Sequence, residues 1–337
     1  MKKIFPKSSQ IKAPVLFLIF NRPDCTKLVF ETIRKYRPRR LYISSDGPRK
    51  KYGIKEKQQV EIVRNIATAV DWPCRVKKLF HVNNLGCGPA IKKAIDWFFK
   101  NEKKGIILED DTIPTKYFYS FCEELLKKYE NDNRIGMIAG TNDTGYKAQV
   151  DSYVFSKKYN TWGWATWRRA WLNMDFSMKW KNNSKNCSNI LKNISHSKSA
   201  MNNWKAAISH IDKNLVSSWD WQWFFSLASQ NQLCITPCVN LIENVGFGES
   251  ATHTKEKHKY INKESKISKM TFPLTHPKYF CPDHKYELYF EKKKFQNQNF
   301  FINCIPNNIK FILKNVFLLI SSKIQHTKNN SKNFKQL

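Results

Sequence analysis

The chain has 337 residues, of which 41% are hydrophobic and 14% aromatic, enough to bury the core of one large α/β domain or two modest ones. Its 58 Lys and Arg against 27 Asp and Glu give a formal net charge of +31, which favours anionic partners: nucleic acid, phosphorylated small molecules or an acidic membrane surface. Base-composition bias also produces Lys- and Asn-rich sequences of this kind, so the charge alone excludes none of these partners.

The N-terminal segment MKKIFPKSSQIKAPVLFLIFNRPD predicts neither a signal peptide nor a membrane span. Its apolar run at 15–20 is shorter than a signal-peptide core, and Asn-Arg-Pro-Asp follows it in place of a cleavage site. No stretch of the chain approaches the length of a membrane span. The nine cysteines lack the paired spacings of a zinc site, so we expect a reduced, cytoplasmic chain.

Short apolar runs alternate with amphipathic segments through the first half of the chain. This alternation predicts a mostly parallel sheet with helices on both faces. In such sheets ligands bind at the carboxyl ends of the strands, where Asn21, Asp46 and the acids at 109–111 lie. The predicted strands are 15–20, 41–45, 75–81, 105–108 and 134–139, and the predicted helices are 24–36, 57–70, 89–99 and 114–129.

The sequence GIILEDDTIP at 105–114 places Glu109, Asp110 and Asp111 directly after a short apolar strand. Carboxylates in this position can ligate a hard divalent cation, which prefers oxygen ligands and commonly bridges phosphates. Three adjacent acids also repel one another, and a bound cation would relieve that repulsion. The alternative is a solvated loop with incidental acids.

The second half of the chain is rich in aromatic residues, in TWGWATWRRAW at 161–171 and SWDWQWFF at 218–225. A polar insertion at 181–200 lies between these segments. After Pro282 the chain becomes basic, and the apolar residues of 306–324 recur at helical spacing with lysines off the stripe. This pattern favours a basic interfacial helix over a membrane span.

Several of these segments together resemble the nucleotide-binding domain of GT-A glycosyltransferases. They are LFLIFNRPD, the strand ending in SSDG, the N-x-x-G turn before a helix, and ILEDDTIPTKYFYSFCEELLKKY. The EDD segment is similar to that of the Golgi N-acetylglucosaminyltransferase I type, while TWGWATWRRAW and SSWDWQW resemble bacterial nucleotide-diphospho-sugar transferases. The resemblance covers roughly residues 12 to 255, and it rests on the order and spacing of the motifs.

The resemblance implies a GT-A (Rossmann-like) domain at 1–285, with a nucleotide-binding half at about 12–140 and an acceptor half at about 141–285. A basic amphipathic tail at 286–337 would follow. Asp111 would be the chief protein ligand of a Mn²⁺ or Mg²⁺ that bridges the diphosphate of a nucleotide-sugar donor. Glu109 and Asp110 would face the ribose, the donor sugar or metal-bound water. Because the usual Asp-x-Asp motif reads Glu-Asp-Asp here, which acid ligates the metal stays open.

The resemblance also implies roles for residues at other strand ends. Asp46 would accept a hydrogen bond from the uracil or ribose, and Asn21 and Arg22 would line the nucleotide pocket. His253, in NVGFGESATHT, lies where the family places a histidine that contacts the diphosphate or the metal. The alternative for His253 is a structural role.

Asp220, in SSWDWQW, matches the Trp-Asp-Asp-Trp segment of the Golgi enzyme and would act as general base. In an inverting transfer a carboxylate removes the proton of the acceptor hydroxyl as its oxygen attacks the anomeric carbon. The flanking indoles would desolvate Asp220 and raise its pKa. The alternative is that Asp220 caps a helix entering 222–228, and the two roles are compatible.

The tryptophans of 161–171 divide into two groups. Aromatic faces pack against the apolar faces of sugar rings, so we expect Trp162 and Trp164, beside Gly163, to contact the donor or the acceptor. Trp167 and Trp171 are expected in the core.

The leading hypothesis is therefore a metal-dependent, inverting glycosyltransferase that moves a hexose or N-acetylhexosamine from a UDP-sugar to a cell-surface glycan or glycolipid. Its basic tail would attach it to the cytoplasmic face of an anionic membrane, and no specific nucleic acid is expected. A sugar-phosphate nucleotidyltransferase is the first alternative, although that class has a Gly-rich phosphate loop where this chain reads FNRPD. A non-enzymatic protein that binds nucleic acid or an anionic surface is the second, although no nucleic-acid-binding module is recognisable.

Overall fold

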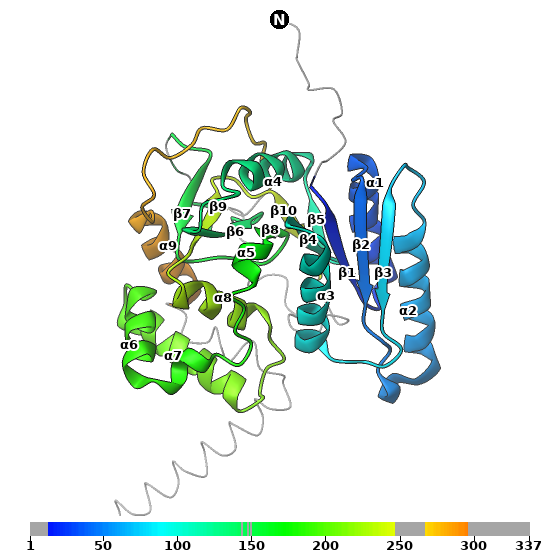
Figure 1. The fold of residues 1–337 in the computed structure, drawn as a ribbon, viewed down its shortest axis with the longest axis horizontal. Helices are drawn as coiled ribbons and strands as arrows, with labels where there is room; N and C mark the ends of the chain where they lie inside the picture. Colours follow the sequence, from blue (N-terminus) through cyan, green and yellow to red (C-terminus); the bar gives the residue numbers. More distant parts are fainter. Residues whose placement is uncertain (1–12, 143, 147, 149, 247–266, 296–337) are drawn as a thin grey trace, which may run out of the picture.

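The computed structural model describes residues 13–142, 144–146, 148, 150–246 and 267–295. These residues form a large mixed sheet flanked by helices (Figure 1). The predicted α/β class with a Rossmann-like sheet is confirmed.

In the first half of the chain, each strand is followed by a helix that returns the chain for the next parallel strand. The apolar runs of the sequence become buried strands, so the predicted elements of this half are confirmed to within a few residues. In chain order they are β1 (Val15–Ile19), α1 (Pro23–Tyr36), β2 (Arg40–Ser45), a 3₁₀ turn (Lys50–Tyr52), α2 (Gly53–Thr68), β3 (Arg75–Phe80), α3 (Cys87–Asn101) and β4 (Lys104–Glu109).

The second half of the chain contributes shorter strands and a group of helices. Its elements are β5 (Thr112–Pro114), α4 (Lys116–Lys128), β6 (Ile135–Ala139), β7 (Tyr153–Ser156), β8 (Trp164–Trp167), α5 (Arg168–Trp171), a 3₁₀ turn (Lys179–Asn182), α6 (Ser184–Asn193), α7 (Lys198–Asp212), α8 (Asp220–Ser229), β9 (Leu233–Pro237), β10 (Ile242–Asn244) and α9 (His284–Phe295).

The eight-stranded sheet has the order β3-β2-β1-β4-β8-β6-β9-β7. β1 pairs in parallel with β2 and β4, so the carboxyl ends of these three strands meet at one edge. β8 runs antiparallel between β4 and β6, which brings its amino end to the same edge. A separate two-stranded ribbon, β5 with β10, lies directly after the acids that end β4.

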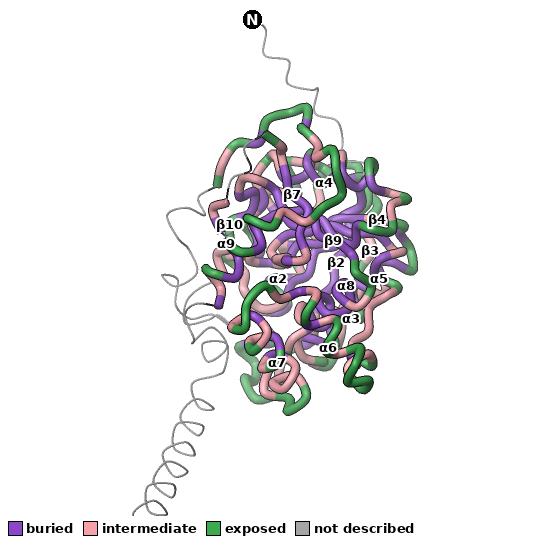
Figure 2. Tube along the Cα trace, turned by 90° about the vertical axis from the view of Figure 1, so that its left-hand side faces the viewer, coloured by how far each residue is buried: buried purple, intermediate pink, exposed green. Residues whose placement is uncertain are grey.

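The core lies on both faces of the sheet, because alternate strand residues point to opposite sides. On β1, Val15, Phe17 and Ile19 belong to a cluster with residues of α1, α2 and α4. Leu16 and Leu18 belong to a second cluster with residues of α3, α5 and α8. Figure 2 shows the central strands buried, with exposed residues concentrated at the loops and outer helix faces, whereas the edge strand β3 is only partly buried.

A third apolar cluster joins α6, α7, α8 and α9 at the end of the molecule away from β3 (Figure 1). Residues 286–295, which the sequence analysis assigned to the tail, belong to α9 and pack in this cluster through Tyr286, Phe290 and Phe295. The rest of the predicted tail, including the helix at 306–324, lies outside the described residues. Within the described part of the chain, no helix has the length and apolar character needed to cross a membrane.

Candidate active site

A cavity of about 270 Å³ opens at the carboxyl ends of β1, β2 and β4. The parallel register of these strands brings together residues that lie up to 90 positions apart in the sequence. The sequence-predicted residues that line the cavity are Arg22, Asp46, Glu109, Asp110, Asp111 and Trp162. Asn21 is partly exposed and is not among the described residues that line it, so its predicted contact with a nucleotide receives no support.

Arg22 and Asp110 form the buried centre of the cavity wall. Asp110 is only 3% exposed, and its two oxygens accept hydrogen bonds from the backbone N–H of Phe20 at 3.0 Å and from Arg22 Nη2 at 2.7 Å. The same Arg22 nitrogen lies 3.0 Å from Asp111 Oδ2. One guanidinium is therefore shared between two carboxylates.

Burial and mutual repulsion make these acids hold protons tightly. Burial, opposed in part by Arg22, raises the pKa of Asp110 to about 6. Burial, followed by the charges of Asp111, Asp110 and Asp220, raises the pKa of Glu109 well above its usual value. Burial alone would lower the pKa of Arg22, but Asp110 and Asp111 more than offset this and raise it. A further cation beside the acids would stabilise their ionised forms.

The donor set of this wall suits a hard cation that a diphosphate would share. Both oxygens of Asp110 are engaged, whereas Glu109 and Asp111 Oδ1 accept no hydrogen bond from the residues that the structure describes. Oxygen ligands of this kind fit Mn²⁺ or Mg²⁺, which usually retain ligand positions for water and phosphate. Within the described residues no group of three or more His, Cys, Asp or Glu side chains is arranged to hold a metal ion.

Residues 245–246 directly follow β10 and lie in close contact with Asp111. The backbone N–H of Val245 donates to the carbonyl of Asp111 at 2.9 Å. A Cβ at Gly246 would lie 2.0 Å from Asp111 Oδ2, so only glycine fits there without moving the carboxylate. This close approach fixes Asp111 relative to Arg22.

Asp46 lines the cavity, but its carboxylate organises a turn. Its oxygens accept hydrogen bonds from the backbone N–H groups of Gly47 at 2.8 Å, Leu85 at 2.9 Å and Gly86 at 3.1 Å, and from Asn84 Nδ2 at 2.9 Å. Asp46 thus holds the N-x-x-G turn at the start of α3. The predicted bond to a uracil or ribose would have to share an acceptor that is already well occupied.

The tryptophan predictions have different outcomes. Trp162 is partly exposed and lines the cavity, in agreement with its predicted position. Trp164 is 0% exposed and stacks on Trp219 with ring centroids 5.7 Å apart, so the prediction that it contacts a sugar is wrong. The reason is that Trp164 begins β8 and points into the core. Trp167 and Trp171 are buried, as predicted.

A second cavity of about 290 Å³ adjoins the first, and the two share Cys87, Glu109 and Trp162 as lining residues. Asp220 lines this second cavity from the first residue of α8. Its Oδ1 accepts a hydrogen bond from Ser218 Oγ at 2.7 Å, and Ser218 Oγ in turn accepts from the backbone N–H of Trp221 at 3.2 Å. Ser218, rather than Asp220, therefore satisfies a backbone N–H in the first turn of the helix, while Asp220 remains a lining residue of the cavity.

Sequence reasoning missed several residues of these cavities. Arg49 lines the first cavity, with its guanidinium 4.2 Å from the ring centroid of Tyr52 and held by Glu56. Cys87 lies between the cavities, and burial raises the pKa of its thiol to about 12, so it is a neutral group there. The only sequence signal for either is its position shortly after a predicted strand.

Two arginines directly follow β8. Arg168 and Arg169 donate to backbone carbonyls at the far end of β8. His253 lies outside the described residues.

No protein-family model matches the chain, and no curated protein matches it. Among solved structures it is similar to HddC from Yersinia pseudotuberculosis, at 13% identity and a TM-score of 0.30, over 47% of this chain and 77% of that one. It is also similar to the glycosyltransferase GlyE of Streptococcus pneumoniae TIGR4, at 12% identity and a TM-score of 0.29, over 51% of this chain and 40% of that one. Likenesses at this level identify neither a family nor an activity.

Proposed function

We propose that this protein is a glycosyltransferase that binds a nucleotide-sugar donor in the first cavity and transfers its sugar to an acceptor hydroxyl at the second. The observation that carries the proposal is the pair of adjoining cavities, one walled by Arg22 and the acids 109–111 and the other by Asp220, with Glu109 common to both. A donor site and an acceptor site must meet at the reacting carbon, and the shared wall supplies such a meeting place.

The residues of the first cavity suit a donor diphosphate. Arg22 presents a guanidinium beside Asp110 and Asp111, and Arg49 adds a second guanidinium to the lining. We propose Asp111, with Glu109, as the protein ligands of a Mn²⁺ or Mg²⁺, which when bound would neutralise charge on the diphosphate. A UDP-sugar is the donor that the resemblance in sequence favours.

Transfer then needs one proton acceptor at the second cavity. As the acceptor oxygen forms its bond to the anomeric carbon, its proton passes to the Asp220 carboxylate. The bond from the anomeric carbon to the diphosphate oxygen breaks, and the nucleoside diphosphate leaves with the electron pair beside Arg22. A single displacement of this kind inverts the anomeric configuration.

A panel of nucleotide sugars, with Mn²⁺ present or chelated, tests this proposal. Binding and turnover are measured for the wild type, Asp111→Asn and Asp220→Asn, with Asp71→Asn as the control because Asp71 is an exposed acid paired with Arg34. We expect Asp111→Asn to lose metal-dependent donor binding, and Asp220→Asn to bind donor but transfer at least about 100-fold more slowly. Normal transfer by both variants would show that the assignment is wrong.

The basic segment at 306–324 supports a separate proposal, that the protein attaches peripherally to an anionic membrane and extends a lipid-linked acceptor. The spacing of its apolar residues and lysines in the sequence supports this proposal. Truncation after residue 300 should release the protein from phosphatidylglycerol vesicles while donor binding persists. Unchanged vesicle binding would contradict this attachment.

A further inference from the structure

The second cavity is walled by three segments that are far apart in the sequence. One is 159–162, which leads into β8, and another is 216–221, which leads into α8. The third is the last turn of α9, which contributes Phe290, Lys294 and Phe295. Trp204 of α7 also lines the cavity, with its ring centroid 5.0 Å from that of Phe295.

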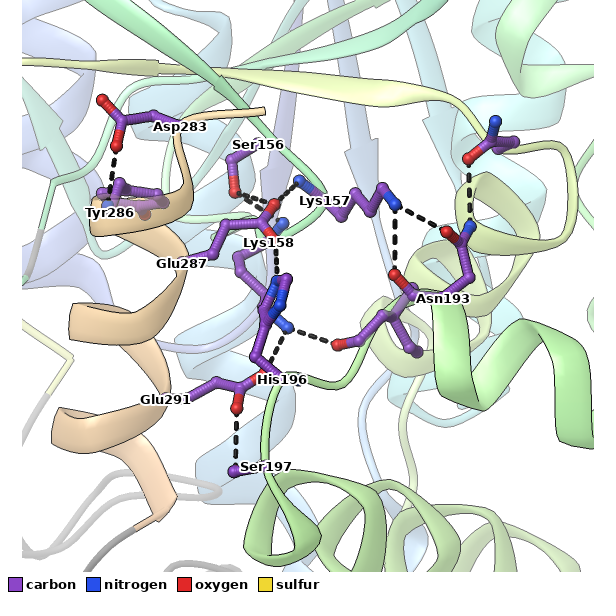
Figure 3. A network of polar contacts seen from close by, with 12 residues as sticks. Ser156, Lys157, Lys158, Asn193, His196, Ser197, Asp283, Tyr286, Glu287 and Glu291 are labelled. Carbon is purple, nitrogen blue, oxygen red and sulfur yellow. Dashed lines mark hydrogen bonds and ion pairs between the residues drawn. The ribbon is translucent and has the colours of Figure 1, made fainter. Parts of the chain in front are cut away.

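A buried polar network fastens α9 to the body of the protein (Figure 3). Lys158 is fully buried, and its ammonium donates to Glu291 Oε1 at 2.8 Å and to the carbonyl of Ile194. Glu287, one helical turn earlier, accepts from Ser156 Oγ at 3.2 Å. Two glutamates four residues apart lie on the same face of a helix, so both reach the strand end at 156–158.

The network continues into the segment before α7. His196 pairs with Glu287 through its ring and donates its backbone N–H to Glu291 Oε1 at 2.9 Å. Ser197 Oγ donates to Glu291 Oε2 at 2.8 Å. The α9 network therefore joins β7, α7 and α9, and residues 156–158 of this network run directly into the cavity wall at 159–162.

This arrangement gives the second cavity a preformed shape. Because the same buried charges hold both 156–158 and α9, two of the three walls are fixed relative to each other. Pairing a buried lysine with a glutamate that makes further hydrogen bonds avoids the large cost of an isolated buried charge. A preformed site lowers the entropy that a ligand loses on binding.

The chemistry of the lining suits a sugar ring. Trp162 and Trp221 present partly exposed indoles, while Thr161, Ser217 and Asp220 supply hydroxyl and carboxylate groups. A pyranose has an apolar face of C–H groups and a rim of hydroxyls, and sites for such ligands combine aromatic surface with a few fixed polar groups.

We propose that the second cavity, with α9 as one of its walls, binds the acceptor as a pyranose ring that packs against the aromatic lining and points a hydroxyl at Asp220. The proposal rests on the glycosyltransferase function proposed above, since that function makes the ring an acceptor. It adds that α9 belongs to the acceptor site.

Blocking the cavity from two sides tests the proposal. Ser217→Trp fills it from an exposed position, and Ser188→Trp, an exposed serine of α6 outside both cavities, is the matched control. Lys294→Trp fills it from α9, and Lys292→Trp, an exposed lysine on the same helix, is the second control. The probes are methyl glucoside, methyl galactoside, methyl mannoside and methyl N-acetylglucosaminide, detected by saturation-transfer NMR with and without UDP.

We expect at least one glycoside to bind the wild type and both controls, and to bind both blocked variants at least about tenfold more weakly. UDP affinity should change by less than about twofold in all four variants, which also shows that they are folded. Glycoside binding that persists in Ser217→Trp, or that is absent from the wild type, overturns the proposed acceptor site. Persistence in Lys294→Trp alone overturns the role of α9. Failure of the wild type to bind any nucleotide or nucleotide sugar would instead overturn the proposed function.

Discussion

Two groups of buried carboxylates in this protein are built in opposite ways. At the end of β4, Asp110 and Asp111 share the single guanidinium of Arg22, and Glu109 accepts no hydrogen bond from the described residues. In the α9 network, Glu287 and Glu291 have polar partners at all four carboxylate oxygens. The first group places three carboxylates beside one guanidinium. In the second group every carboxylate oxygen has a polar partner.

The difference separates a structural use of buried charge from a functional one. A fully satisfied buried network rigidifies its surroundings, while acids left short of partners have raised pKa values and attract a cation or a proton. Glu109, which accepts no hydrogen bond from the described residues, has a pKa raised by burial and then by its acidic neighbours.

Lys158→Met breaks the α9 network by leaving Glu291 without its cation. Removing one partner of a buried ion pair destabilises a protein by about 3–5 kcal/mol, so we expect a loss of this size in the free energy of unfolding. Chemical denaturation measures it, with Lys157→Met as the control because Lys157 is only partly buried and its ammonium bonds Asn193. An equal loss in the free energy of unfolding for both variants would show that the buried Lys158–Glu291 pair stabilises the protein no more than the contacts of Lys157.

Gly246→Ala disturbs the acids at the end of β4 without changing any charge. The added methyl would lie 2.0 Å from Asp111 Oδ2, so the carboxylate must move. Overpacking of this kind costs about 1–3 kcal/mol, and we expect both lower stability and weaker Mn²⁺-dependent binding of nucleotide sugars. Calorimetric titration measures the binding, and unchanged affinity would show that the placement of Asp111 is unimportant.

Neutralising one acid in each group should change stability in opposite directions. Glu291→Gln places an amide where an acceptor is needed and should destabilise by about 1–3 kcal/mol. Glu109→Gln removes a carboxylate whose ionisation is opposed by burial and by neighbouring acids, and should raise the free energy of unfolding at pH 8. The stability gain should accompany weaker metal binding, because Glu109 is one of the two proposed ligands. A loss of stability in Glu109→Gln would contradict the raised pKa.

The pH dependence of stability provides the finest comparison. An acid whose pKa is raised in the folded state binds its proton more tightly when the protein is folded. Its stabilising contribution is therefore complete at pH values below the pKa that it has in the unfolded state. For Asp110 this contribution is lost as the pH rises from about 4, the unfolded value, to about 6, the folded one. Relative to the wild type, Asp110→Asn should lack this decline, as measured by denaturation at pH 4 to 7. Parallel curves would show that Asp110 has an ordinary pKa.

Local sequence signals predicted the elements that form the first cavity. The runs ending at Ile19, Ser45 and Glu109 are apolar and short, and the helices between them have one apolar face. Parallel pairing then places their carboxyl ends together by geometry alone. The meeting of Arg22 with the acids follows from that topology.

Other features depend on contacts that one sequence does not display. Trp164 has helical spacing to Trp167 and Trp171, but pairing with β4 and β6 makes 164–167 a strand and buries its first residue. The basic character of 286–295 predicted a tail there rather than the helix α9. Its buried residues nevertheless have the i, i+4 spacing of a buried helix face: Tyr286, Glu287, Phe290 and Glu291. Their polar partners lie about 90 to 130 residues away.

The wall that the two cavities share has a consequence for inhibitor design. Because Cys87, Glu109 and Trp162 line both cavities, the function proposed above implies that a molecule joining a nucleoside to a sugar ring needs only a short linker to occupy both. Its second half would bind at an effective concentration in the millimolar range, so two weak fragments could combine into a ligand about 100-fold tighter than either or better. In this protein the lining residues common to both cavities would make such avidity accessible to a small molecule.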